Sequence, residues 1–201
     1  SSHQFDVAAH GFSFRSEGAL DMRMDRRAKR TAAQLVAELD DVALTDVLRR
    51  YGEVDGAHRV ARELVRARGE RAITTTTQLV EALRQVTPRR EENSFLAQVF
   101  QALRIAVNDE LGSLELLLRM SAEVIRPGGR LVVMSYHSLK DRMVKNWLRS
   151  GDPDGKETKD VFGNLQRPFK PTHSKAMKPG EREIERNPRA RSARLRIGER
   201  I

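Results

Sequence analysis

The chain has 201 residues, of which 39% are hydrophobic and 32% are charged. This length predicts one domain or two small ones, and the apolar content can bury a core, which excludes a wholly disordered chain. The sequence contains no cysteine, which excludes disulfides, thiolate metal sites and cysteine nucleophiles and fits a cytoplasmic protein. No apolar stretch reaches the roughly 20 residues that cross a bilayer, so we expect no contact with a membrane.

The positive charge is concentrated near the end of the chain. Residues 164–201 carry 11 Lys+Arg against 4 Asp+Glu, whereas the rest of the sequence is almost balanced. A local basic excess favours a polyanion as partner, because binding releases condensed counterions. A solvated basic tail has the same composition, so charge alone leaves both interpretations open.

The first part of the chain has the apolar periodicity of helices. Thr31 and Gln34 form a capping box, which predicts that a helix begins there. Further helices are expected over residues 44–51, 57–67, 79–86 and 94–107. Gly69 is expected to end the helix over 57–67. A last helix, which stops at Pro127, is expected to turn inward Leu114, Leu117, Leu118 and Ile125.

After Gly129 the periodicity changes. Residues 130–136 form a short apolar run, typical of a strand that is covered on both faces in a parallel sheet. Ser138 and Asp141 predict the cap of the next helix, and the proline-rich residues 150–190 predict an irregular segment. Residues 192–199 alternate in polarity and predict a closing strand, with its arginines on one face.

Two strands are too few for a sheet of ordinary size. They fit either a small α+β domain or a larger sheet whose other strands lie upstream of residue 1, and we favour the second interpretation. The chain does not begin with Met, so we expect it to be part of a longer protein.

Four longer motifs, at residues 10–25, 100–111, 135–142 and 186–196, carry a family resemblance. In this order they closely resemble the MraW (RsmH) family. The resemblance implies an S-adenosylmethionine-dependent methyltransferase that modifies the N4 amine of one cytidine in the decoding centre of bacterial 16S ribosomal RNA. It also implies small-subunit ribosomal RNA and the 30S subunit as partners, and it leaves a homodimer open.

The fold implied by this resemblance is α/β, namely the C-terminal part of a Rossmann-like methyltransferase sheet with an inserted all-helical domain. Residues 1–15 would end the first part of the methyltransferase domain, 16–107 would form the insertion, and 108–201 would form the C-terminal part. The family's glycine-rich cofactor loop and its motif Asp have no counterpart here. We therefore assign no catalytic residue and expect this chain alone to bind S-adenosylmethionine weakly or not at all.

The resemblance also assigns binding roles. Gln4 follows Ser1 and Ser2 at the spacing of a cofactor-binding glutamine, whose amide both donates and accepts, and the two serines belong to the loop that lines the target-base pocket. Tyr136 and His137 end the first strand, where open α/β sheets bind ligands. Tyr136 would stack on a flipped base and His137 would bind phosphate or a base edge. The alternative is that both only cap the strand and anchor the next helix.

Two further groups of residues are candidate sites. Arg189 and Arg191 are candidate substrate-binding residues, in a basic cluster with Arg186, Arg194 and Arg196 that we expect to face RNA in part. The run of Asn108, Asp109 and Glu110 resembles a metal site only superficially, since adjacent helical residues point in different directions. We therefore expect no metal and favour a role of this run in the fold, where it would join the insertion to the catalytic domain.

Two other functions stay open at this point. One is a non-catalytic RNA- or ribosome-binding fragment, and the other is a methyltransferase of the same fold that acts on a protein or a small molecule.

Overall fold

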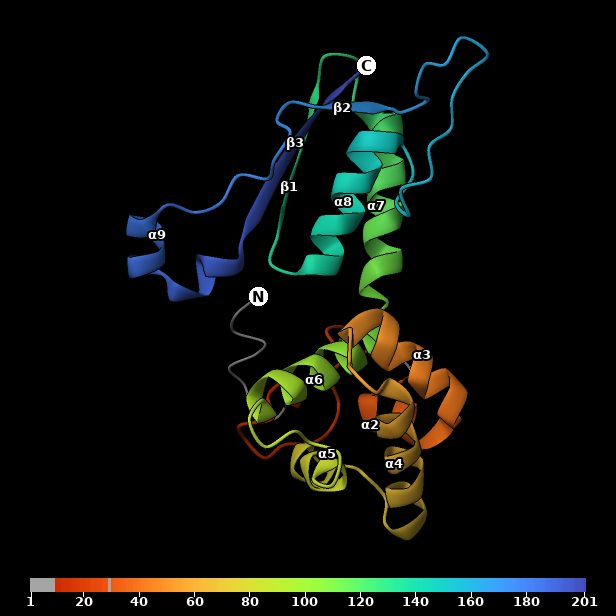
Figure 1. The fold of residues 1–201 in the computed structure, drawn as a ribbon, viewed down its shortest axis with the longest axis vertical. Coiled ribbons are helices and arrows are strands. Elements are labelled where there is room, and N and C mark those ends of the chain that lie inside the picture. The colour runs from red at the N-terminus through yellow and green to blue at the C-terminus, as the bar shows by residue number, and fades with distance from the viewer. Residues whose placement is uncertain (1–9, 29) are drawn as a thin grey trace. The chain divides into compact units, whose positions relative to one another are not determined.

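A computed structural model describes residues 10–28 and 30–201 (Figure 1). The chain forms two compact units, Ser1–Glu110 and Leu111–Ile201. The first is mainly helical and the second is mixed α/β where the structure describes them. No helix in the described ranges is long and apolar enough to cross a membrane.

The described part of the first unit contains five helices. These are α2 (Ala32–Glu38), α3 (Asp41–Gly52), α4 (Ala57–Glu70), α5 (Thr76–Leu83) and α6 (Glu92–Asn108). The predicted capping box is confirmed, because Thr31 accepts from the Gln34 amide while the Gln34 side chain accepts from the Thr31 amide. A second box at Thr75 and Gln78 begins α5, earlier than predicted. Gly69 does not end α4, which continues to Glu70.

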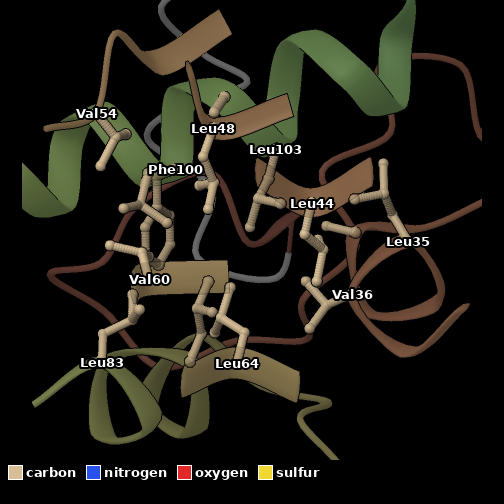
Figure 2. Close-up of a cluster of buried hydrophobic side chains, with 14 of the residues drawn as sticks. Leu35, Val36, Leu44, Leu48, Val54, Val60, Leu64, Leu83, Phe100 and Leu103 are labelled. Atoms are coloured by element: carbon tan, nitrogen blue, oxygen red, sulfur yellow. The ribbon is translucent and has the colours of Figure 1, made fainter. Parts of the chain in front are cut away.

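The core of the first unit lies among these helices. Leu44, Leu48, Leu64 and Leu103 are fully buried, and Figure 2 shows their side chains gathered with Phe100 between the helices. Each comes from the apolar stripe of its own helix, so the periodicity of the sequence places them correctly. Assignment of residues 16–107 as an insertion stays a prediction, because the first unit by itself does not show what it is inserted into.

Asn108 fixes the last turn of α6 to the segment that precedes α2. Its Nδ2 atom donates to the carbonyl oxygens of Met22 (2.7 Å) and Arg104 (2.8 Å), and its Oδ1 atom accepts from the Met24 amide at 2.7 Å. Met22 has a φ of 58°, a left-handed conformation that costs a non-glycine residue free energy and needs such support. Asn108 therefore has a role in the fold of the first unit, and the predicted role in joining the insertion to the catalytic domain stays a prediction.

Glu110 also serves the fold. One of its carboxylate oxygens lies 2.7 Å from Nε of Arg104 in a mostly buried ion pair. Among the residues that the structure describes, no cluster of three or more His, Asp or Glu side chains is arranged to hold a metal ion.

We expect Asn108→Ala to lower the free energy of unfolding by about 2 kcal/mol, because it leaves partly buried backbone groups unpaired. Urea unfolding of the chain measures this loss. Asp109→Asn is the matched control, since the neighbouring Asp109 has a left-handed φ of 44° that asparagine tolerates. We expect the control to stay within about 0.5 kcal/mol of the parent. Equal losses in both variants would contradict the role given to the Asn108 amide.

The second unit combines helices with a small sheet. Its helices are α7 (Glu110–Val124), α8 (Ser138–Ser150), α9 (Glu181–Arg186) and a short 3-10 helix (Pro188–Ser192). Its strands are β1 (Arg130–Ser135), β2 (Phe169–Pro171) and β3 (Arg194–Arg200), in the order β1-β3-β2, with both pairs antiparallel. Leu118 of α7 and Trp147 of α8 share a buried cluster with Leu131 and Phe169 of the sheet, so both helices cover one face.

The environment of β1 differs from the prediction. The strand is present over the expected residues, but its described neighbour β3 is antiparallel. Its outer face is open, with Val132 and Met134 55% and 57% exposed. The expectation of a strand covered on both faces is therefore wrong for the described chain. Leu117 of α7 was expected to point inward and is 54% exposed. That further strands complete this sheet in a Rossmann-like domain stays a prediction.

Candidate nucleic-acid interface

A cleft of about 470 Å³ opens in the second unit where β1 ends and α8 begins. It is lined by the junction between these elements, by α8 itself and by β3. Figure 1 shows where these elements lie in the fold. The lining residues are Tyr136, His137, Ser138, Asp141, Arg142, Lys145, Ser192, Arg194 and Arg196. The structure thus brings the two residues predicted at the end of the first strand together with two arginines from the closing strand.

The strand register explains this meeting. Ser135, the last residue of β1, pairs with Arg194, the first residue of β3, so residues just after β1 lie beside the beginning of β3. Side chains two apart on a strand share a face. Arg194 and Arg196 both line the cleft, which confirms the prediction that they lie on one face.

An ion pair joins α8 to β3 on the wall of the cleft. Nε and Nη2 of Arg196 donate to the two carboxylate oxygens of Asp141 at 2.7 and 2.9 Å. The side chains are only 13% and 20% exposed, and the two-point geometry is the strongest form of this pair. The carboxylate of Asp141 therefore holds the sheet against the helix.

The cleft is positively charged. Its lining contains four basic side chains and one carboxylate, and that carboxylate is engaged with Arg196. Arg142, Lys145 and Arg194 therefore give a net positive potential. Lys145 was not singled out from the sequence, although it follows Asp141 by four residues, the spacing that places two residues on one side of a helix.

His137 caps α8. Its Nδ1 atom accepts from the Leu139 amide at 3.2 Å, and Ser138 is the first residue of the helix. The prediction that Ser138 supplies the cap is wrong, because the extended backbone at His137, with φ −135° and ψ 135°, lets its ring reach the free amide instead. The anchoring alternative is thus confirmed for His137, and a contact of its ring with phosphate or base stays a prediction.

Tyr136 presents an aromatic ring at the mouth of the cleft. The side chain is 56% exposed, and its hydroxyl donates to Sδ of Met134 at 3.6 Å. The ring makes no ring–ring contact with a described residue. An exposed aromatic face beside positive side chains is the arrangement on which an unstacked base can lie.

The remaining predicted residues lie outside this cleft. Arg189 and Arg191 are exposed on the 3-10 helix, which leads through Ser192 into the lining but does not place these arginines in it. Their contact with RNA stays a prediction. Ser1, Ser2 and Gln4 lie outside the described residues.

The cleft does not fit S-adenosylmethionine. This molecule carries two positive groups, a sulfonium and an ammonium, and only one carboxylate, so its net charge is positive. A site for it should therefore offer carboxylates that are not already paired with a basic side chain. Asp141, the one carboxylate in the described lining, is paired with Arg196. The cleft instead suits a ligand with several negative charges, such as a phosphate backbone.

Comparison with known proteins gives consistent matches. The sequence matches the MraW methylase family over residues 1–201. The ribosomal RNA small subunit methyltransferase H of Parabacteroides distasonis is 50% identical over 201 residues, which are 100% of this chain and 66% of that protein. Its namesake from Amoebophilus asiaticus is 50% identical over 200 residues (100% and 64%), and that from Bacteroides thetaiotaomicron is 48% identical over 199 residues (99% and 66%). The chain thus spans about 66% of these relatives.

Proposed function

The chain belongs to the MraW methylase family, and from this we propose that the protein acts in the S-adenosylmethionine-dependent methylation of small-subunit ribosomal RNA. The names of its relatives support the proposed activity and substrate. The finer part of the proposal is the target, the N4 amine of a cytidine in the decoding centre. Association with the 30S subunit belongs to the same proposal.

The observation that carries this proposal is the cleft at the end of β1. The N4 amine of cytosine is a weak nucleophile, since its lone pair is delocalised into the ring. An enzyme that modifies such a base must unstack it and hold it in position. Tyr136 offers an exposed ring for the base, and Arg194 and Lys145 offer charges for the neighbouring phosphates. We assign the second unit to RNA binding.

The methyl donor would be held elsewhere in the protein. We propose Gln4 as a contact of S-adenosylmethionine and Ser1 and Ser2 as residues near the target base. The resemblance of their motif supports these three roles, and they are independent of the cleft in the second unit.

Salt titration tests the RNA-binding part of the proposal. We expect the 201-residue chain to bind a labelled single-stranded RNA from the decoding region, followed by fluorescence anisotropy. The logarithm of the binding constant should fall with log[salt] with a slope of about −2 to −3, because three or four phosphate contacts contribute about 0.7 each on a single strand. A flat titration would reject the assignment.

Tyr136→Ala separates the base contact from the charge contacts. We expect it to weaken RNA binding by about 5- to 100-fold, the loss for one base–aromatic stack, with the salt slope unchanged because the ring has no charge. Val161→Ala, at a 94% exposed position outside the cleft, is the control and should bind like the parent.

Methyl transfer separates the proposed enzyme from the alternatives. Small ribosomal subunits are incubated with labelled S-adenosylmethionine and a protein of the full length of the relatives, and the nucleosides are identified by mass spectrometry. N4-methylcytidine is the expected product. RNA binding without any transfer would favour a non-catalytic RNA- or ribosome-binding protein. Transfer only to a protein or a small molecule would favour the third function.

A further inference from the structure

A second cleft, of about 380 Å³, lies on the other side of Lys145 in the same unit. Lys145 and Arg196 line both clefts, so the two adjoin. The apolar part of the second cleft's lining, here called the floor, includes Leu148, Pro171 and Met177. Met177 is 45% exposed, which leaves an apolar surface open to a ligand.

The wall of this second cleft is a short arch that is fixed at both ends to β3. Thr172 donates its amide to the Ile197 carbonyl at 3.0 Å, and Met177 and Leu195 exchange two backbone hydrogen bonds of 2.9 Å. Between these two anchors the chain leaves the sheet, and His173, Ser174 and Lys175 line the cleft. The arch is therefore held in place by hydrogen bonds before any ligand binds, which lowers the entropic cost of binding.

The rim of the second cleft is cationic. Lys145 and Arg149 lie one turn apart on α8, and Lys175 lies on the arch. No ion pair joins these three side chains to any residue in the described part of the chain, and no carboxylate lines the cleft. An apolar floor with positive charges on its rim matches a ligand that is flat and apolar on one side and carries phosphate on the other.

We propose that the second cleft binds a nucleotide that neighbours the target in a single-stranded stretch of RNA, with the base on the floor and the phosphates on the rim. Lys145 lies between the clefts and would contact the phosphate that joins the two nucleotides. The inference rests on the proposed RNA binding and adds a second contact along the same strand. An acidic peptide is the competing ligand, but it has no need of an apolar floor beneath its charges.

Two variants at exposed positions test this site without disturbing the core. Lys175→Gln removes one rim charge, and Met177→Ser removes part of the floor. Lys178→Gln is the matched control, since Lys178 is also exposed, lies three residues from Lys175 and is outside the lining. Thermal unfolding of all three should match the parent, so that any loss of binding reflects the cleft.

The binding assay compares a single nucleotide, cytidine 5′-monophosphate, which can fill only one cleft, with an RNA of roughly eight nucleotides, which is long enough to reach both clefts. We expect Lys175→Gln to weaken binding of the longer RNA about fivefold at about 0.1 M salt and to reduce its salt slope by about 0.7. Met177→Ser should weaken the longer RNA several-fold with no change of slope. Neither variant should affect binding of the single nucleotide at the first cleft, whereas Tyr136→Ala should weaken binding of both ligands.

Each outcome decides between the two proposals. If Tyr136→Ala weakens RNA binding while Lys175→Gln and Met177→Ser leave binding of the longer RNA unchanged, the second site is overturned and the RNA-binding proposal stands. If no RNA binds to the parent, both proposals fail. If an acidic peptide binds, is lost in Lys175→Gln and is not displaced by the longer RNA, the cleft is a protein-binding site and this inference is wrong.

Discussion

Gly11→Ala is expected to destabilise the first unit by about 2–5 kcal/mol. Gly11 has a φ of 68°, a left-handed conformation that costs a residue with a Cβ atom about 1–2 kcal/mol. A Cβ atom at this position would also lie 2.1 Å from the carbonyl oxygen of Ala19. That contact is far too short, and overpacking of this kind adds about 1–3 kcal/mol.

The neighbouring backbone cannot easily move away from such a Cβ atom. The carbonyl oxygen of Ala19 accepts from the Asp21 amide at 2.8 Å, and the Leu20 amide donates to Thr74 at 2.9 Å. Ala19 also forms an isolated β-bridge with Thr75. A shift of Ala19 would therefore break contacts that hold this segment against the beginning of α5.

Urea unfolding with a second glycine variant isolates the close contact. Gly56 also has a left-handed φ, of 65°, but the atoms nearest to its added Cβ atom belong to the Arg59 side chain, at 3.2 Å or more. Gly56→Ala should therefore cost only about 1–2 kcal/mol, from the backbone conformation alone. A loss of the same size in both variants would show that the approach of Gly11 to Ala19 has no energetic consequence.

The motif around Gly11 illustrates what the sequence can and cannot predict. The string of residues 10–25 was recognised by resemblance, yet no local pattern explains it. Its glycine is required by a contact with Ala19, and its Met22 is held by Asn108, which lies 86 residues away in the sequence. Such contacts depend on the tertiary fold and have no periodic signal.

Local sequence patterns predicted the helices more accurately than the strands. The capping box at Thr31 was found because both partners lie within four residues, and the same signal at Thr75 was overlooked. β2 has only three residues, within a segment predicted to be irregular. Phe169 in this strand is fully buried, but it is buried by partners distant in sequence, so no alternation marks it.

The candidate cleft was predicted in part. The sequence correctly placed Tyr136 at a strand end and Arg194 and Arg196 on one face, because both rules follow from sheet geometry. The meeting of Tyr136 with Arg194 follows only from the strand register. Lys145 was missed, since a lysine on a helix usually marks only a solvated face. Arg189 and Arg191 were treated as part of a loop, whereas a turn of 3-10 helix carries them outside the lining.

Asp141→Ala is expected to weaken the fold and to strengthen RNA binding. Loss of the carboxylate leaves the mostly buried Arg196 guanidinium without its partner, which should lower the free energy of unfolding by about 2–3 kcal/mol, somewhat less than the loss for a fully buried pair. The cleft gains one net positive charge at the same time. At about 0.1 M salt, one additional phosphate contact should tighten RNA binding about fivefold and make the salt slope steeper by about 0.7.

The reciprocal variant has a different signature. Arg196→Met leaves the Asp141 carboxylate uncompensated, so both stability and RNA affinity should fall. The double variant removes both charges and should recover RNA affinity close to that of the parent. Its loss of unfolding free energy should be smaller than the sum of the losses in the two single variants, because the pair is coupled. Anisotropy titrations and urea unfolding of all four proteins provide this comparison. An unchanged salt slope in Asp141→Ala would mean that RNA does not pass over this wall of the cleft, since a guanidinium released beside a phosphate backbone must contribute to the slope.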